Sequence, residues 1–167
     1  MKRLPCIVVM GVAGSGKTTL GRELGARLHL PFQEGDDLHP ESNIEKMRSG
    51  LPLTDKDRLP WLEQCRDWLR NQAGQGGILS CSALKRSYRD ILRSSHVPLL
   101  FVFPDVPVAV LRERLRSRSG HFMKENLLES QIATFEPPTE EEHDILTISY
   151  DLSVEEISRK IRELSDR

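Results

Sequence analysis

A glycine-rich loop near the start of the chain carries the residues with the most specific chemistry. Gly11, Gly16, Lys17 and Thr18 follow the spacing Gly-x-x-x-x-Gly-Lys-Thr, which is typical of loops that bind phosphate groups. The glycines allow backbone angles that a side chain would forbid, so backbone N–H groups can turn toward phosphate oxygens. Lys17 adds a positive charge for the β and γ phosphates, and the Thr18 hydroxyl is suited to ligate Mg²⁺. We therefore predict that the chain binds a nucleoside triphosphate. The expected contacts are Gly11, Ala13, Gly14, Ser15, Gly16, Lys17, Thr18 and Thr19.

Two carboxylates follow the second predicted strand, and their chemistry complements that of the loop. Glu34 and Asp36 stand on either side of Gly35 at the end of an extended segment over residues 30–34. One carboxylate beside a phosphate loop is suited to accept the proton of an attacking hydroxyl, and the other to hold Mg²⁺. The alternative is a pair of turn-forming residues on a solvated loop. The nearby phosphate loop favours the catalytic interpretation, with Asp36 catalytic and Glu34, together with Thr18, at the metal.

Two arginines further along the chain share one face of a predicted helix. Arg114 and Arg118 lie four residues apart, and Gly120 follows as a hinge. A hinged segment that carries arginines can close over the phosphates, exclude water and stabilise charge in the transition state. The alternative is an ordinary solvated helix face, which we prefer for Arg112 and Arg116. For Arg114 and Arg118 the sequence favours a lid over about residues 114–138, with Arg118 catalytic and Arg114 at the nucleotide.

Strands and helices alternate along the chain and must position these side chains. Apolar runs predict strands near residues 6–10, 30–34, 78–81, 98–103 and 145–148, and helical patterns fill the intervals. This alternation predicts right-handed crossovers and a parallel sheet covered on both faces. We expect an α/β fold of three layers, αβα, with a five-stranded parallel sheet, in a single domain over residues 1–167. Ligands of such sheets bind beyond the carboxyl ends of the strands, where the loop and the acidic pair fall.

The helix that follows the acidic pair shows both a start signal and a core stripe. Asp57 is suited to cap this helix, with Pro60 in its first turn, where the missing N–H does no harm. Trp61, Cys65 and Trp68 recur at helical spacing, which indicates a core stripe rather than a ligand-binding surface.

Charge and composition exclude several classes of partner. The 24 basic and 25 acidic residues nearly cancel, which argues against nucleic acid or a membrane surface as a partner. Cys6, Cys65 and Cys81 are far apart and odd in number, so we interpret them as reduced thiols. The apolar run after Met1 is too short for a signal peptide and continues into the phosphate loop. We expect a soluble, cytoplasmic protein.

Two classes of nucleotide-binding protein are consistent with the phosphate loop. One is a kinase that transfers the γ-phosphoryl group to a small molecule, and the other is a switch or motor-type ATPase whose output is a change of shape. A GTPase switch would carry Asp-x-x-Gly after a strand and Asn-Lys-x-Asp for guanine, and the sequence contains neither. The acidic pair favours the kinase.

The blocks that follow the phosphate loop resemble the gluconokinase family. The resemblance runs through Glu34-Gly35-Asp36-Asp37-Leu38-His39-Pro40 and through Asn43, Lys46-Met47 and residues 50–62. It resumes at Cys81-Ser82-Ala83-Leu84-Lys85 and the residues up to Asp90, at Arg114 to Phe122, and at Gln131-x-x-x-Phe135-Glu136-Pro137. Other small kinases of this fold share the phosphate loop but lack the Leu-His-Pro and Cys-Ser-Ala-Leu-Lys strings.

This resemblance implies a shikimate-kinase-like or nucleoside-monophosphate-kinase-like fold and Mg·ATP-dependent phosphorylation of the 6-hydroxyl of D-gluconate. Asp36 would then orient or deprotonate that hydroxyl, within a substrate-binding segment over about residues 36–62. The implied sugar-acid contacts are Asp36, His39, Arg58, Lys85, Arg89 and His121. Family members are often homodimers, so a homodimer is possible. We expect adenine contacts from the lid and from the loop after Ile148.

Each implied contact has a structural alternative. Lys85 and Arg89 could form a solvated helix start, and Arg58 could pair with a nearby aspartate. His39 could be a turn residue, and His121 could cap the lid. A kinase for shikimate or a nucleoside monophosphate stays open, as does a nucleotide switch that is not a kinase.

Overall fold

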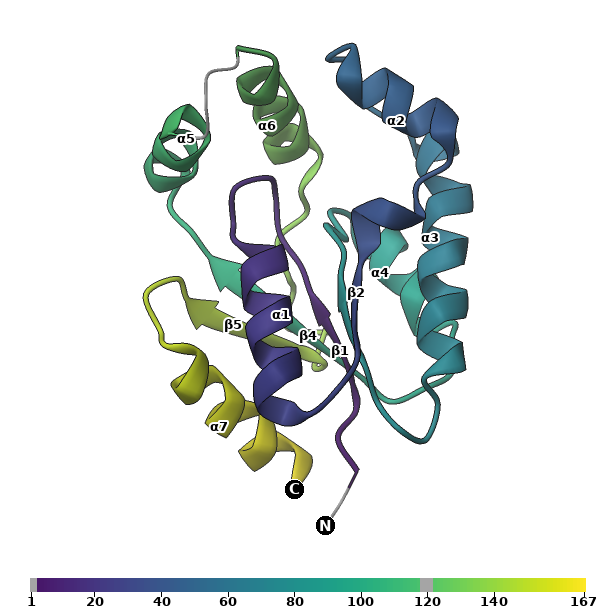
Figure 1. Ribbon diagram of the computed structural model, residues 1–167, viewed down its shortest axis with the longest axis vertical. Helices are drawn as coiled ribbons and strands as arrows, with labels where there is room; N and C mark the ends of the chain where they lie inside the picture. Colours follow the sequence, from purple (N-terminus) through teal and green to yellow (C-terminus); the bar gives the residue numbers. More distant parts are fainter. Residues whose placement is uncertain (1–2, 118–121) are drawn as a thin grey trace.

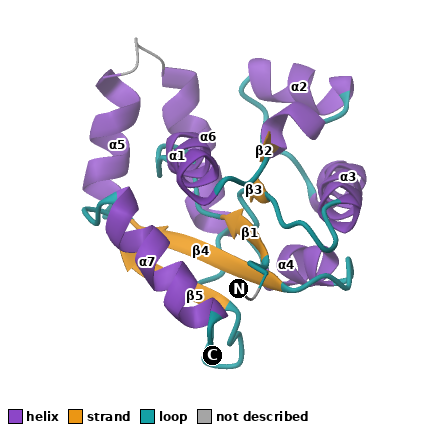
Figure 2. Ribbon diagram, turned by 60° about the horizontal axis from the view of Figure 1, so that its bottom comes forward, coloured by secondary structure: helices purple, strands orange, loops and turns teal. Residues whose placement is uncertain are grey.

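A computed structural model describes residues 3–117 and 122–167 of the chain. Its five strands form a single parallel sheet in the order β2-β3-β1-β4-β5 (Figures 1 and 2). The strands are β1 (Cys6–Val9), β2 (Phe32–Glu34), β3 (Ile78–Ser80), β4 (Leu99–Asp105) and β5 (Ile145–Ser149). The helices of the described part are α1 (Lys17–Leu28), the 3₁₀ turn η1 (Gly35–Leu38), α2 (Glu41–Arg48), α3 (Asp55–Asn71), α4 (Arg86–Arg93), α5 (Val108–Ser117), α6 (Phe122–Thr134) and α7 (Val154–Ser165). The predicted α/β fold with a five-stranded parallel sheet is confirmed.

The central strand shows why the sheet is covered on both faces. Successive side chains of a strand point to opposite faces, and every residue of β1 is buried. Val8 joins a core that includes Trp61 of α3, whereas Ile7 joins one that includes Leu24 of α1. Figure 2 shows α1 and α7 on one side of the sheet and α3 and α4 on the other. The three-layer αβα arrangement follows from this double burial, as expected of a parallel sheet.

The junction between β2 and η1 depends on a glycine. The backbone of Gly35 passes so close to β3 that a Cβ would lie 1.9 Å from the carbonyl oxygen of Ser80. On its other side, the Trp61 indole Nε1 donates a hydrogen bond of 2.7 Å to the carbonyl oxygen of Gly35. Glycine therefore lets η1 lie against the sheet, and α3 holds it there. Trp61 is buried, which confirms its place in the core, but its ring also lines a small cavity at the edge of that core.

The start of α3 differs from the prediction. Thr54, rather than Asp57, is the N-cap, and Asp57 is the third helical residue of a reciprocal capping box. The Thr54 hydroxyl accepts from the Asp57 N–H at 3.1 Å, and the Asp57 carboxylate accepts from the Thr54 N–H at 2.9 Å. Because the helix begins earlier, Pro60 lies beyond its first turn.

The helices α5, α6 and α2 lie beyond the carboxyl ends of the strands. Figure 1 shows α5, α6 and α2 at the end of the molecule where the loop between β1 and α1 lies. This is the edge of a parallel sheet at which ligands bind. No helix in the described part of the chain is both long and apolar enough to cross a membrane.

Candidate active site

The loop between β1 and α1 has the backbone shape that binding phosphate requires. Gly11, Gly14 and Gly16 have φ angles of 140°, 83° and 84°, in the region that favours glycine. Gly16 is the N-cap residue of α1, so the N-terminus of this helix faces the loop. Lys17 Nζ donates to the carbonyl oxygen of Val12 at 3.1 Å, which places the ammonium group across the loop. The structure thus builds the anion cradle that the sequence predicts.

The two predicted metal ligands meet at the first turn of α1. The Thr18 hydroxyl donates a hydrogen bond to Glu34 Oε2. Glu34 Oε1 accepts from the Ser80 hydroxyl at 2.8 Å and from the Asp36 N–H at 3.3 Å, which holds the carboxylate in place. No group of three or more acidic, histidine or cysteine side chains among the described residues could hold a metal alone. One hydroxyl and one carboxylate beside a phosphate loop fit Mg²⁺, which keeps several waters and completes its shell with phosphate oxygens.

Asp36 lies where two adjoining cavities meet. One cavity, of about 300 Å³, is lined by the phosphate loop, Thr18 and Glu34, and the other, of about 100 Å³, extends toward α3. Both are lined by Lys17 and Asp36. The Asp36 side chain is 75 % exposed to this open space, yet surrounding protein partly desolvates it. This desolvation raises the pKa of Asp36 above its ordinary value, Lys17 opposes the rise, and Glu34 and Asp37 add to it.

The smaller cavity combines polar groups with a flat aromatic wall. His39 stacks on Trp61 with ring centroids 4.2 Å apart and an interplanar angle of 14°. Burial, followed by the nearby Arg58 charge, lowers the pKa of His39 to about 4, so its imidazole is neutral near pH 7. Arg58 is buried, lines the cavity and donates to the Tyr88 hydroxyl at 3.1 Å. A cation, a neutral imidazole and a carboxylate thus surround one small space.

A third cavity, of about 530 Å³, lies on the other side of the phosphate loop. Arg114, Ile148 and Tyr150 line it together with Gly14 and Gly16. Arg114 donates to the carbonyl oxygen of Gly14 at 3.0 Å, and its guanidinium lies 5.9 Å from the centroid of the Tyr150 ring. The position of this cavity next to the phosphate loop suits a nucleoside attached to the bound phosphates. The predicted adenine contacts, from the lid and the loop after Ile148, fall on this cavity.

Comparisons with known proteins agree with this geometry. A family model described as an AAA domain matches residues 6–138. A gluconokinase of Gluconobacter oxydans is 56 % identical over 138 residues, which cover 81 % of this chain and 78 % of that protein. The thermosensitive gluconokinase of Escherichia coli is 40 % identical over 158 residues, covering 93 % of this chain and 84 % of the relative.

The crystal structure of a gluconokinase from Sinorhizobium meliloti superposes with a TM-score of 0.87 at 43 % identity, covering 99 % of this chain and 96 % of that one. The chain belongs to the gluconokinase family. The shikimate kinase of Aquifex aeolicus, at 21 % identity and a TM-score of 0.54, shares the fold alone. The gluconokinase family resemblance and the kinase fold that the sequence implied are therefore confirmed.

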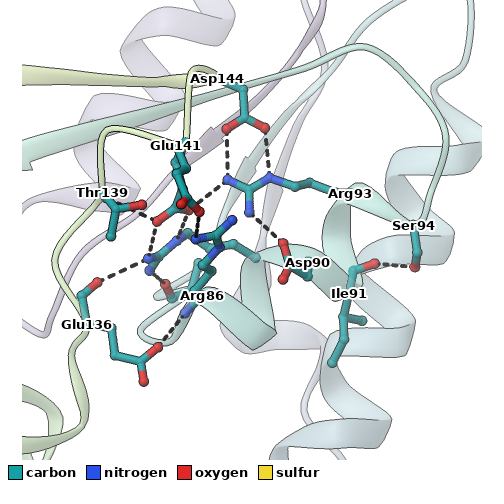
Figure 3. Close-up of polar contacts among 12 residues, drawn as sticks. Arg86, Asp90, Ile91, Arg93, Ser94, Glu136, Thr139, Glu141 and Asp144 are labelled. Carbon is teal, nitrogen blue, oxygen red and sulfur yellow. Dashed lines mark hydrogen bonds and ion pairs between the residues drawn. The ribbon is translucent and has the colours of Figure 1, made fainter.

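The structure places one predicted gluconate contact, Arg89, away from the cavities. Its side chain is fully buried, and its five N–H groups are donated to Glu142 and to the carbonyl oxygens of Ala83, Leu84 and Glu136. Figure 3 shows the surrounding network, in which Arg93 faces Asp144 through two hydrogen bonds of 2.8 Å. No N–H of Arg89 remains for a ligand, so the prediction that it binds the substrate is wrong.

Lys85 is a second predicted contact that lies away from the cavities. Lys85 pairs with Asp55 at 2.9 Å, and the described residues that line the cavities do not include it. Arg118 and His121, predicted for catalysis and for substrate binding, lie outside the described residues. The structure therefore brings Asp36, His39 and Arg58 together at the cavity of about 100 Å³. It brings Thr18 and Glu34 together at the cavity of about 300 Å³.

One cavity residue was missed as a site residue in the sequence analysis. Gln131 of α6 lines both cavities around Asp36, and its Oε1 accepts a hydrogen bond of 2.7 Å from the Ala13 N–H. Leu127, Gln131 and Phe135 lie four residues apart, so Gln131 is a polar residue within an apolar helix face. That break in the pattern was the signal that could have identified it.

Proposed function

We propose that this protein transfers the γ-phosphoryl group of Mg·ATP to the 6-hydroxyl of D-gluconate, giving 6-phospho-D-gluconate and ADP. The observation that carries this proposal is the place of Asp36. Together with Lys17 of the phosphate loop, Asp36 lines both the cavity at that loop and the small polar cavity lined by His39 and Arg58. An alcohol in that cavity meets a carboxylate on one side and the phosphate cradle on the other. This is the arrangement that phosphoryl transfer to an alcohol needs.

The chain's own residues account for the steps of this reaction. Asp36 orients the 6-hydroxyl and accepts its proton as the oxygen attacks phosphorus, and ADP leaves with the electrons of the broken P–O bond. Lys17 and the arginines at 114 and 118 neutralise charge on the transferring group. Thr18 and Glu34 would hold Mg²⁺, which when bound offsets the charge of the phosphates. We propose a lid over about residues 114–138 and a substrate-binding segment over about residues 36–62.

The chemistry of the smaller cavity suits a sugar acid. Gluconate is a polyol with one carboxylate, so its site should offer a cation and several polar groups rather than an apolar slot. Arg58 supplies the cation, and a guanidinium can bind a carboxylate through two parallel hydrogen bonds. His39 and Asp36 supply polar contacts for hydroxyl groups. A homodimer and a cytoplasmic location stay predictions.

A panel of acceptors tests the proposal. ADP release would be measured with gluconate, other sugar acids, shikimate, AMP, CMP and water alone, each with Mg·ATP. We expect gluconate to give the highest kcat/KM. A faster rate with shikimate or a nucleoside monophosphate would assign a different small-anion kinase. A slow rate that no acceptor increases would indicate a nucleotide switch.

Replacing Arg58 tests the carboxylate contact. Arg58→Gln should raise the KM for gluconate roughly 10- to 100-fold, because a charge-assisted hydrogen bond contributes about 1.5–3 kcal/mol. The KM for ATP should stay nearly unchanged, since Arg58 lines neither of the two larger cavities at the phosphate loop. Glucitol, in which a CH₂OH group replaces the carboxylate, should have a low kcat/KM with the parent. Arg58→Gln should not lower that value further, because glucitol has no carboxylate for Arg58 to bind.

The matched control is Arg70→Gln, which changes an exposed arginine of the same helix. Arg70→Gln should leave both KM values unchanged. An Arg58→Gln variant that folds normally and keeps the parent's KM for gluconate would show that another group binds the carboxylate.

A further inference from the structure

A buried asparagine lies directly behind the smaller cavity. Asn43 belongs to α2 and is only 2 % exposed. Its Nδ2 atom donates a hydrogen bond of 2.8 Å to the carbonyl oxygen of Asp57 in α3. The same Nδ2 atom lies 3.2 Å from Nδ1 of His39. Asn43 therefore connects the backbone of α3 with the imidazole that lines the cavity.

These two contacts determine which nitrogen of His39 carries the proton. A backbone carbonyl can only accept, so the Asn43 atom that faces Asp57 must be the amide nitrogen and not the amide oxygen. The second hydrogen of that nitrogen points to His39 Nδ1, which must then accept. A neutral imidazole has one donor and one acceptor nitrogen, so its proton lies on Nε2.

The Nε2 side of the ring faces the proposed catalytic carboxylate. His39 Nε2 lies 4.0 Å from Asp36 Oδ1, which is longer than a hydrogen bond. Stacking on Trp61 fixes the plane of the ring, and Trp61 is itself held by its bond to Gly35. Burial of the ring, followed by the positive charge of Arg58, lowers the pKa of His39 and so disfavours a second proton on the ring. The single N–H of the ring thus lies on the nitrogen that is 4.0 Å from Asp36 Oδ1.

We propose that Asn43 is a positioning residue that holds the proton of His39 on Nε2, so that this N–H donates to the alcohol oxygen seated next to Asp36. The alcohol then accepts from His39 and donates its own hydrogen to Asp36, which leaves a lone pair of the oxygen for phosphorus. With the proton on Nδ1, the lone pair of Nε2 would face the carboxylate, and two N–H groups would oppose each other at Asn43. The role toward the alcohol rests on the function proposed above, whereas the position of the proton does not.

Nitrogen NMR tests the position of the proton without any substrate. In protein labelled with ¹⁵N at histidine, we expect a pyrrole-type shift for His39 Nε2 and a pyridine-type shift for Nδ1 at pH 7.5. His39→Gln identifies the signals by their loss. In Asn43→Ala the two shifts should move toward each other as both tautomers become populated, and in the control Ser42→Ala, an exposed neighbour on α2, they should not move. A pyrrole-type shift at Nδ1 of the parent, or unchanged shifts in Asn43→Ala, would overturn the proposal.

A kinetic cycle tests the consequence for gluconate phosphorylation. The amide side chain introduced by His39→Gln has no tautomers, so its N–H donors stay on the amide nitrogen whether or not Asn43 is present. Asn43→Ala should therefore lower kcat about tenfold in the parent, as expected for the loss of one neutral hydrogen bond, and less than about twofold in the His39→Gln background. Equal losses in both backgrounds would show that Asn43 only supports the fold, and the proposal would be wrong. If the parent shows the Nε2 proton but does not phosphorylate gluconate, the proposed function fails and the tautomer assignment stands.

Discussion

Replacing Asp36 by asparagine should lower kcat for gluconate phosphorylation by roughly 10²–10⁴, which is the usual contribution of a general base. The substitution keeps the size of the side chain but removes the group that accepts the proton of the alcohol. Asp36 lies beside Lys17 and lines both cavities, so an asparagine there still contacts the alcohol but cannot take its hydrogen. The binding of ATP depends on the loop and on α1, so the Kd for ATP should change little.

The neighbouring residue provides a matched control for this prediction. Asp37 is exposed, and the described residues that line the cavities do not include it. Asp37→Asn removes the same charge one residue away and should leave kcat within about a factor of three, as expected for a surface substitution. Steady-state kinetics and an ATP titration of both variants measure the comparison. Similar kcat values for the two variants would show that Asp36 does not act as the base and has only a structural role in η1.

The fold and the phosphate loop could be predicted because their signals are local. The spacing of Gly11, Gly16 and Lys17 depends only on neighbouring residues, and the alternation of apolar runs needs no knowledge of tertiary contacts. The meeting of Thr18 with Glu34 also follows from the topology, because parallel strands bring the segments after β1 and β2 to the same edge of the sheet. These predictions required only strand order and side-chain chemistry.

The sugar-acid contacts were harder to predict because burial is not visible in a short motif. Arg89 lies in the first turn of a helix that follows a strand, as a ligand-binding arginine would. Its actual partner, Glu142, lies 53 residues away, and only the tertiary fold brings the two together. Likewise, Thr54 and Asp57 both suit an N-cap, and the structure shows that they act as a reciprocal pair. Gln131 contacts the phosphate loop from a helix 118 residues further along the chain.

Removing the charge of Glu142 should destabilise the protein by about 3–5 kcal/mol, which is the cost of leaving one member of a buried ion pair without its partner. The Glu142 side chain is 1 % exposed and accepts from Arg89 Nε and Nη2, each at 2.8 Å. Arg89 lowers the pKa of Glu142, which falls to about 2 despite the opposing effect of burial. A carboxyl with a depressed pKa stabilises the fold above its unfolded pKa, near 4.5, and this contribution is lost as the pH falls toward 2. In Glu142→Gln, unfolding at pH 7 should need less denaturant, and stability should fall less between pH 5 and pH 2.

Two further variants distinguish the loss of the buried ion pair from the loss of a negative charge in general. Glu141 is 76 % exposed and pairs with Arg86 at the surface, so Glu141→Gln should cost less than about 0.5 kcal/mol. Arg89→Met combined with Glu142→Leu should cost less than the sum of the two single changes, because neither charge is then left buried alone. Part of the loss should remain, since Arg89 also donates to the carbonyl oxygens of Ala83 and Glu136 and so joins the loop after β3 to the segment after α6. Equal denaturation midpoints for Glu142→Gln and Glu141→Gln would show that the Arg89–Glu142 pair does not contribute to the free energy of unfolding. The stability prediction would then be wrong.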